Sequence, residues 1–247
     1  MAHQVSSRVA VVTGGSGGIG RACALRLARD SFSVIINFGS NSAKADQAVA
    51  DIRGICGAAV AAQGDVADEA AMAAVFDLAE TEFGGVDVVV HTAARNVRSL
   101  LVDLDLAVLD SLYRTNIRGT FVVDQQAARR IRSGGAIINL SSSVLQAGLP
   151  TFGAYTASKG AVEALTLILA RELQGRDVTV NAVAPGQTAT DTFLSLQSEA
   201  EIQRGVDAIA LGRLAQPADI ANVVAFLAGP DGHWINGQVI RANGGLL

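Results

Sequence analysis

Short apolar runs alternate with longer stretches of helical periodicity along the whole chain. The apolar runs predict strands at 8–13, 32–37, 58–63, 86–92, 135–142, 177–185 and 237–245. Between them, apolar residues recur at helical spacing and predict helices at 18–30, 41–53, 68–83, 103–131, 153–170 and 217–228. Because strands that alternate with helices form βαβ units, we expect an α/β fold: a doubly wound parallel sheet with helices on both faces.

The composition fits a single domain, residues 1–247, built around a buried sheet. Of the 247 residues, 50% are hydrophobic and 17% are charged, which is enough for a large core. No apolar run reaches the roughly 18 residues of a membrane span, and the first run is too short for a signal peptide. We therefore expect a cytoplasmic protein without membrane contact.

Charge and metal-ligand residue types argue against two further classes of protein. The net charge is −4 at pH 7 and there is no basic tract, so nucleic acid is not an expected partner. The two cysteines and three histidines show no spacing typical of metal ligands. We therefore expect no metal site and two reduced thiols.

A glycine-rich loop, TGGSGGIG from Thr13, joins the first predicted strand to the first predicted helix. Glycines allow a sharp turn and the close approach of a pyrophosphate, and the helix N-terminus supplies free N–H groups. An ordinary flexible turn is the alternative, but the strand–turn–helix context favours binding. The loop predicts that a dinucleotide is bound by Gly14, Ser16, Gly18, Ile19 and Gly20.

The end of the second predicted strand bears on which dinucleotide is bound. An acidic residue there would hydrogen-bond a free ribose 2′-hydroxyl and repel a 2′-phosphate. Phe38 and Gly39 stand where such a carboxylate is expected. Ser40 and Asn41 follow, with Lys44 nearby, and can donate to a phosphate, although Ser and Asn are also good helix N-caps. We predict NADP as the cofactor.

The third predicted strand is followed by GDV, which contains Asp65 and Val66. Asp65 can accept a hydrogen bond from the amino group of an adenine. It can equally cap the helix that follows. We expect both residues at the adenine end of the cofactor site, with the two roles of Asp65 left open.

Tyr155 and Lys159 form an i, i+4 pair on one face of the helix predicted at 153–170. Reduction of a ketone requires a hydride donor and a proton donor. A free tyrosine has a pKa of about 10, and a nearby ammonium favours the phenolate. We predict that Lys159 lowers the pKa of Tyr155, which serves as general acid in reduction and general base in oxidation. A solvated pair on an amphipathic helix is the alternative.

Several motifs in this order resemble the short-chain dehydrogenase/reductase family. They are TGGSGGIG from Thr13, GDV from Gly64, Asn116 in YRTNIRG, NLSSS from Asn139, YTASK from Tyr155 and APG from Ala184. The resemblance covers nearly the whole chain. It implies a single-domain Rossmann fold and hydride transfer between a nicotinamide and a carbonyl or hydroxyl substrate. Matched by motif, it implies the catalytic set Asn116, Ser142, Tyr155 and Lys159.

The resemblance also implies roles around this set. Lys159 would hold the nicotinamide ribose, Ser142 the substrate carbonyl, and Asn116 a water-linked proton path to Lys159. The further cofactor residues that it implies are Thr92, Ala93, Pro185, Gly186, Thr188 and Thr190. The chain departs from the family twice. HTAA from His91 replaces a run similar to Asn-Asn-Ala-Gly, and Gly17 stands where NADP-binding members often carry a basic residue.

The substrate is less narrowly defined. The pattern is most similar to 3-oxoacyl-[acyl-carrier-protein] reductases, which implies NADPH-dependent reduction of a 3-oxoacyl thioester in fatty acid biosynthesis. Enzymes acting on a free ketone, sugar or secondary alcohol share these motifs, and a non-catalytic dinucleotide sensor is a further alternative. We expect a substrate lid at about 187–215. The side chains expected to line the pocket, with core packing as the alternative, are Leu145, Gln146, Leu149, Phe152, Phe193, Leu194 and Leu196.

Two kinds of protein partner are considered. Acyl carrier protein is acidic, so an enzyme that recognises it needs cations near its mouth. The candidate cations are Arg129, Arg130, Arg132 and Arg171, with solvated helix faces as the alternative. Members of the family commonly form homotetramers through the long helices after strands four and five, and the resemblance therefore implies a homotetramer or homodimer.

Overall fold

A sheet of seven parallel strands forms the centre of the computed structural model, which describes residues 8–195 and 197–246. The strands are β1 (Val9–Thr13), β2 (Ser33–Phe38), β3 (Ala59–Gln63), β4 (Val86–His91), β5 (Ile131–Leu140), β6 (Thr179–Pro185) and β7 (Val239–Ala242). Their order, β3-β2-β1-β4-β5-β6-β7, reverses direction between β1 and β4. In such sheets ligands bind beyond the carboxyl ends of the strands at the reversal. The predicted fold class is confirmed.

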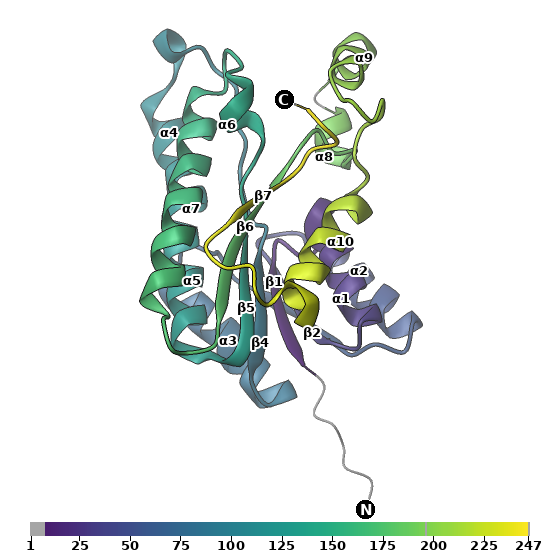
Figure 1. Ribbon diagram of the computed structural model, residues 1–247, viewed down its shortest axis with the longest axis vertical. Coiled ribbons are helices and arrows are strands. Elements are labelled where there is room, and N and C mark those ends of the chain that lie inside the picture. The colour runs from purple at the N-terminus through teal and green to yellow at the C-terminus, as the bar shows by residue number, and fades with distance from the viewer. Residues whose placement is uncertain (1–7, 196, 247) are drawn as a thin grey trace, which may run out of the picture.

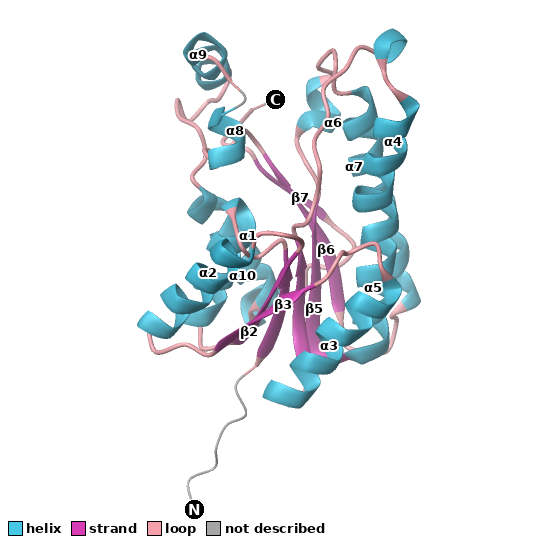
Figure 2. Cartoon of the chain, turned by 180° about the vertical axis from the view of Figure 1, so that it is seen from behind, coloured by secondary structure: helices cyan, strands magenta, loops and turns pink. Residues whose placement is uncertain are grey.

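Helices cover both faces of this sheet (Figure 1 and Figure 2). One layer consists of α1 (Gly18–Arg29), α2 (Ser42–Gly54) and α10 (Pro217–Ala228). The other contains α3 (Glu69–Phe83), α5 (Gly119–Arg130) and α7 (Gly153–Glu172). Alternate residues of β1 face opposite layers, Ala10 and Val12 toward the first and Val9 and Val11 toward the second. The continuous apolar runs therefore reflect strands that are covered on both sides.

The single long helix expected at 103–131 is interrupted. After a short 3-10 turn, η1 (Leu101–Asp103), α4 (Leu106–Tyr113) runs into a π-helical turn, η2 (Arg114–Arg118), and α5 begins at Gly119. β5 then starts at Ile131, earlier than expected. A π turn widens the helix by one residue without removing its apolar stripe, so periodicity does not reveal it. Such turns occur frequently at functional sites.

Short helices gather with loops at the carboxyl end of the sheet, where only a loop or polar segment was expected (Figure 1). They are α6 (Val144–Ala147), α8 (Asp191–Ser195) and α9 (Glu199–Asp207); a 3-10 turn, η3 (Pro230–Gly232), precedes β7. Elements this short show too few turns for a periodic pattern. The start of α9 nevertheless carries a capping box, in which Ser198 and Glu201 bond each other's backbone N–H groups, a signal that sequence reasoning missed.

The described residues form neither a membrane helix nor a metal cluster. No helix among them is long and apolar enough to cross a bilayer. Nowhere in this part of the chain do three His, Cys, Asp or Glu side chains lie close enough together to hold a metal ion. Both cysteines are free; burial raises the pKa of the Cys23 thiol to about 12, so this thiol is unreactive.

A polar pair is buried between α5 and β5. Asp124 is 3% exposed, and its Oδ2 accepts a hydrogen bond from Asn139 Nδ2 at 3.0 Å. Asp124 Oδ1 and Asn139 Oδ1 have no partner among the described residues. Burial raises the pKa of Asp124 to about 7, although the bond from Asn139 acts in the opposite direction. A charged Asp124 therefore destabilises the folded state.

We expect Asp124→Asn to stabilise the protein at pH 8. A carboxyl group whose pKa rises on folding, from 3.8 to about 7, binds more protons in the folded state. Wild-type stability therefore falls as the pH rises between these values, by about 4 kcal/mol at full titration. Urea unfolding of the variant should show a gain that grows from pH 4 to pH 7. Asp110→Asn, at an exposed position of α4, is the control, and a gain independent of pH would contradict the assignment.

Candidate active site

A cleft of about 1530 Å³ runs along the carboxyl end of the sheet. This volume exceeds the roughly 300–1,000 Å³ of an ordinary small-ligand site, so a dinucleotide and a substrate can lie side by side. The lining includes every residue expected to bind the cofactor: Gly14, Ser16, Gly18, Ile19, Gly20, Ser40, Asn41, Asp65, Val66, Thr92, Ala93, Tyr155, Lys159, Pro185, Gly186, Thr188 and Thr190. Ser142 also lines it, whereas Asn116 does not.

The glycine loop has the shape that a pyrophosphate requires. Gly14 and Gly18 have φ values of +63° and +51°, which side chains disfavour. A Cβ on Gly20 would lie 2.3 Å from Gly14 O, whereas a Cβ on Gly17 would meet nothing within 4 Å. Gly17 is the N-cap of α1, and no side chain caps this helix. The N–H groups at its start are therefore available to an anion in the cleft.

The loop after β2 presents donors and no carboxylate to the cleft. Gly39, Ser40, Asn41 and Lys44 line it. Asn41 is also the N-cap of α2, because its Oδ1 accepts a hydrogen bond from Lys44 N at 3.0 Å. The capping role is thus present, and the cap uses only the Oδ1 of Asn41, so its NH₂ group keeps its capacity to donate. Lys44 Nζ lies 3.9 Å from Asp191 Oδ2, and both side chains are exposed.

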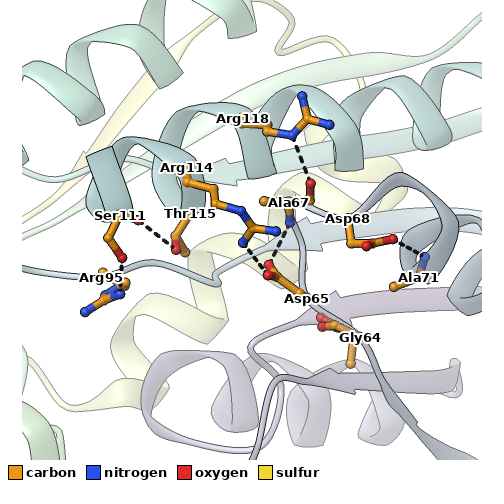
Figure 3. Close-up of polar contacts among 11 residues, drawn as sticks. Gly64, Asp65, Ala67, Asp68, Ala71, Arg95, Ser111, Arg114, Thr115 and Arg118 are labelled. Carbon is orange, nitrogen blue, oxygen red and sulfur yellow. Dashed lines mark hydrogen bonds and ion pairs between the residues drawn. The ribbon is translucent and has the colours of Figure 1, made fainter. Parts of the chain in front are cut away.

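Asp65, which follows β3, is held by two donors (Figure 3). Its Oδ1 accepts a hydrogen bond from Ala67 N at 2.9 Å, and its Oδ2 forms an ion pair with Arg114. Burial pushes the pKa of the carboxyl group up, but these bonds and the Arg114 charge hold it below its ordinary value. The capping alternative for Asp65 is wrong, because Asp68 caps α3 by accepting from Ala71 N at 2.8 Å. Sequence reasoning missed Arg114 because it lies 49 residues away.

Ser142, Tyr155 and Lys159 meet where β5 ends and α7 begins. The side chains of Ser142 and Tyr155 both line the cleft, and Ser142 is placed to lower the pKa of the Tyr155 phenol. Lys159 is 4% exposed, and its Nζ donates to Leu140 O at 2.6 Å. The same Nζ lies 5.8 Å from the centroid of the Tyr155 ring. The i, i+4 spacing on α7 and the end of β5 together place a hydroxyl, a phenol and an ammonium in one corner of the cleft.

The two hydroxyls next to Ser142 have partners elsewhere. Ser141 Oγ donates to Glu163 Oε1 at 2.7 Å, and Ser143 Oγ donates to Ala184 O at 3.1 Å. Both side chains are therefore occupied in joining β5 to α7 and β6. Of the three serines, Ser142 is the one whose side chain acts on the pKa of Tyr155.

The pKa of Tyr155 moves opposite to the sequence expectation. Burial raises it to about 12, and the hydrogen bond from Ser142 only partly opposes this. Burial also lowers the pKa of Lys159 to about 8. The prediction that Lys159 lowers the Tyr155 pKa is wrong for this structure, because desolvation outweighs the attraction and Nζ donates to a carbonyl instead. Tyr155 is a protonated phenol at neutral pH and so a proton donor.

Asn116 acts on the protein backbone around the site. It is buried in the π turn, where its Oδ1 accepts a hydrogen bond from Arg95 N at 2.8 Å and its Nδ2 donates to Arg95 O at 2.9 Å. The same Nδ2 donates to Ser158 Oγ at 3.0 Å, and Ser158 Oγ donates to Tyr155 O at 2.7 Å. Asn116 thus ties the loop after β4 to the first turn of α7.

His91 connects the glycine loop to the same π turn. Its Nδ1 lies 2.8 Å from Thr13 Oγ1, and its Nε2 lies 3.1 Å from Thr120 Oγ1. Thr120 Oγ1 donates its one hydrogen to Asn116 O at 2.7 Å, so it can only accept from His91. His91 Nε2 therefore carries the ring hydrogen and donates it to Thr120. His91 Nδ1 has no hydrogen and accepts from the Thr13 hydroxyl. Burial, followed by the charge of Lys159, lowers the pKa of His91 to about 3, so the ring is neutral.

Only part of the expected substrate pocket lines the cleft. Leu149, Phe152 and Phe193 do. Leu145, Gln146 and Leu194 do not, and Leu196 lies outside the described residues. The reason for Leu145 and Gln146 is helical geometry: Val144 and Ala147, three residues apart on α6, face the cleft, so the two residues between them point away from it.

The arginines that were expected to bind a carrier protein do not line the cleft. Arg129 and Arg130 end α5, and Arg132 follows at the start of β5, so all three are at the amino end of the sheet. Arg171 is in the last turn of α7, whose first turn carries Tyr155. Ion pairs already occupy Arg130, with Asp77 and Glu80, and Arg132, with Asp87.

Comparison with known proteins agrees with this site. A family model described as Enoyl-(Acyl carrier protein) reductase matches residues 14–247. NADPH-dependent aldehyde reductase 2, chloroplastic, of Arabidopsis thaliana is 38% identical over 98% of this chain and 95% of its own length. The 3-oxoacyl-[acyl-carrier-protein] reductase FabG of Staphylococcus aureus is 39% identical, over 97% of this chain and 98% of its own. A solved short-chain dehydrogenase from Burkholderia cenocepacia J2315, in complex with NADP, matches with a TM-score of 0.92 and 36% identity, over 99% of both chains.

A seven-stranded doubly wound sheet with a glycine loop beside a Ser–Tyr–Lys group defines a class of dinucleotide-dependent oxidoreductases. Together with the matches in sequence and structure, this shows that the chain belongs to the short-chain dehydrogenase/reductase family. The resemblance read from the motifs is confirmed.

Proposed function

We propose that this protein reduces a carbonyl group to an alcohol with NADPH. The observation that carries the proposal is the meeting of Ser142, Tyr155 and Lys159 in the cleft that the glycine loop also lines. When bound, the cofactor supplies a hydride to the carbonyl carbon. The chain must then supply a proton to the carbonyl oxygen, and the protonated phenol of Tyr155 is placed to do so.

The other side chains support this proton transfer. Ser142 donates a hydrogen bond to the carbonyl oxygen and holds it near Tyr155. Lys159 stabilises the phenolate left after transfer and holds the nicotinamide ribose. Asn116 positions these groups through its bonds to Arg95 and Ser158, and its turn is the proposed end of a water-linked proton path to Lys159.

The preference for NADP rests on the loop after β2. An acidic side chain at this point would repel a 2′-phosphate, and the loop instead places Ser40, Asn41 and Lys44 along the cleft. The relative from Arabidopsis is described as NADPH-dependent, and the Burkholderia structure contains NADP. Gly17 supplies no basic side chain, so Lys44 is the proposed cation for the phosphate.

The proposed substrate is a 3-oxoacyl thioester, with acyl carrier protein as a candidate carrier in fatty acid biosynthesis. The description of the family model and the FabG relative support it. A free aldehyde or ketone is the second candidate, supported by the aldehyde reductase at 38% identity. A dinucleotide sensor without catalysis is disfavoured, because the chain retains all four catalytic residues.

Two further proposals concern a lid over the cleft and the oligomeric state of the protein. The proposed lid is the segment 187–215, within a single domain of residues 1–247. It contains α8 and α9, and described residues of both helices line one wall of the cleft. The proposed location is the cytoplasm and the proposed assembly a homotetramer or homodimer. The assembly is supported by apolar side chains exposed on α4, α5 and α7, among them Leu106, Phe121 and Ile168. Sedimentation velocity measures this state.

The test is NADPH oxidation on acetoacetyl-CoA and on hexanal, with NADH in parallel. We expect turnover of the thioester and at least about a tenfold preference for NADPH in kcat/KM, the value of one good charge-assisted contact. A preference for NADH would contradict the cofactor proposal. Faster reduction of hexanal would favour the second candidate. Cofactor binding without turnover of either would favour the sensor.

A further inference from the structure

The substrate end of the cleft has a cationic mouth. Arg95 and Arg98 line it from the loop after β4, and Arg204 lines it from α9 on the opposite wall. We call these three residues the mouth arginines. Arg114 and Arg118 pair with Asp65 and Glu69. By contrast, none of the mouth arginines has a carboxylate within 4.0 Å among the residues described.

Arg98 is fixed close to the reacting centre. Its guanidinium carbon lies 4.7 Å from the centroid of the Phe152 ring, within the range of a cation–π contact. The centroid of the Phe152 ring lies 6.5 Å from that of the Tyr155 ring. One aromatic ring therefore separates the charge of Arg98 from the proposed proton donor. A group of the substrate can contact both at once if it extends past Phe152.

Arg95 is held by the catalytic scaffold. Both its backbone N–H and its backbone carbonyl bond to the side chain of Asn116, at 2.8 and 2.9 Å. Its guanidinium donates to Ser111 Oγ (Figure 3). The remaining N–H groups of this exposed side chain point to no carboxylate in the described chain. The mouth thus contains a second guanidinium whose position depends on the same residue that ties the loop to α7.

One carboxylate, that of Glu201, faces the mouth arginines from the lining of the cleft, and it is already occupied. Its Oε2 accepts hydrogen bonds from Ser198 N at 2.8 Å and from Ser198 Oγ at 2.7 Å. These bonds are the main reason that the pKa of Glu201 is lowered, and the charges of Arg98 and Arg204 lower it further. Arg98 and Arg204 therefore both act on the single negative charge of Glu201, and Arg95 lines the same cleft without a carboxylate partner among the described residues.

We propose that the mouth arginines bind an anionic group of the carbonyl substrate, either a carboxylate or a phosphate. The inference rests on the proposed carbonyl reduction and narrows its substrate class. Guanidinium groups bind such oxyanions with paired, charge-assisted hydrogen bonds. The anion binds across the mouth between the loop after β4 and α9, so that substrate binding joins the two walls of the cleft. This proposed site is distinct from Arg129, Arg130, Arg132 and Arg171, the candidate cations for a carrier protein, none of which lines the cleft.

The test compares turnover of each charged substrate with turnover of an uncharged analogue, called its neutral twin below. Acetoacetyl-CoA carries phosphates, whereas the acetoacetyl thioester of N-acetylcysteamine carries none. 4-Oxopentanoate carries a carboxylate, and its methyl ester is neutral. The variants are Arg98→Gln, Arg204→Gln and the double variant. Arg129→Gln and Arg171→Gln, at exposed positions away from the cleft, are the matched controls.

We expect each mouth variant to lower kcat/KM for a charged substrate about tenfold, mainly through KM. Turnover of the neutral twins and both control variants should stay within about twofold of wild type. A loss confined to acetoacetyl-CoA identifies the anion as a carrier phosphate, and a loss confined to 4-oxopentanoate identifies it as a substrate carboxylate. Equal losses on charged and neutral twins, or no loss on either, would overturn the proposal.

Binding without turnover separates this proposal from the proposed reduction. Isothermal titration of the NADP⁺-saturated protein with coenzyme A and with 4-oxopentanoate requires no chemistry. Weaker binding in the Arg98 and Arg204 variants, with no turnover of any carbonyl, would reject the reduction and support the anion site. Turnover that is insensitive to both arginines would support the reduction and reject the site. Absence of both binding and turnover would reject both.

Discussion

Tyr155→Phe is expected to lower kcat for carbonyl reduction by about 10²–10⁴-fold, the usual contribution of a positioned general acid. The variant removes one oxygen, and with it the proton that the partly buried phenol holds at neutral pH. The ring remains to pack against Phe152 and beneath Lys159. NADPH affinity, measured by fluorescence titration, should therefore change less than about twofold.

The chain provides a matched control in its one other tyrosine. Tyr113 ends α4 and does not line the cleft, so Tyr113→Phe should leave both kcat and cofactor affinity near wild type. Equal losses in the two variants would indicate a structural effect of removing the hydroxyl. Full turnover in Tyr155→Phe would show that another group delivers the proton.

Lys159→Met should abolish turnover and, at the same time, change how stability depends on pH. Burial lowers the pKa of Lys159 from 10.5 to about 8, so the folded state disfavours its charge. This penalty is complete below pH 8 and is relieved as the pH rises from 8 to 10.5. Wild-type stability relative to the variant should therefore increase by about 1.4 kcal/mol per pH unit, or about 2 kcal/mol from pH 8 to pH 9.5.

Near pH 7 two effects of Lys159→Met oppose each other. Removing the buried charge stabilises the variant by about 3 kcal/mol. Leaving the Leu140 carbonyl without its donor costs about 1–3 kcal/mol. The slope with pH is therefore the sharper measurement, made by urea unfolding. Lys44→Met, at the one other lysine and at an exposed position, is the stability control. Parallel pH profiles for wild type and Lys159→Met would contradict a shifted pKa.

Sequence alone was sufficient where the interactions are local or periodic. The alternation of apolar runs with helical stretches predicts the order of the major strands and helices, because burial on both faces of a parallel sheet leaves continuous apolar runs. The glycine loop and the Tyr155–Lys159 pair are also local, since each spans only a few residues of one element. The cofactor residues after β4 and β6 were implied by the family resemblance rather than by local pattern, and they too line the cleft.

Contacts between distant segments required the folded structure. Asp65 meets Arg114 across 49 residues, and Asn116 bonds both backbone groups of Arg95 from within a π turn that periodicity does not show. Three of the predicted carrier arginines, Arg129, Arg130 and Arg132, are close in sequence yet lie at the amino end of the sheet. Arg204 lies more than a hundred residues after Arg95 and Arg98, yet all three line one cleft because the ends of β4 and β6 open onto the same edge of the sheet.

The direction of the Tyr155 pKa shows most clearly what sequence could not determine. A lysine one helical turn away predicts a lowered pKa, because Coulomb attraction follows from spacing alone. Desolvation depends on every element that closes around the pair, here β5, α7 and the loops at the sheet edge, and it raises the pKa to about 12. The sequence determined that Tyr155 and Lys159 lie one turn apart on the same helix. Tertiary structure decided how much water each group retains, and therefore which of them carries the proton.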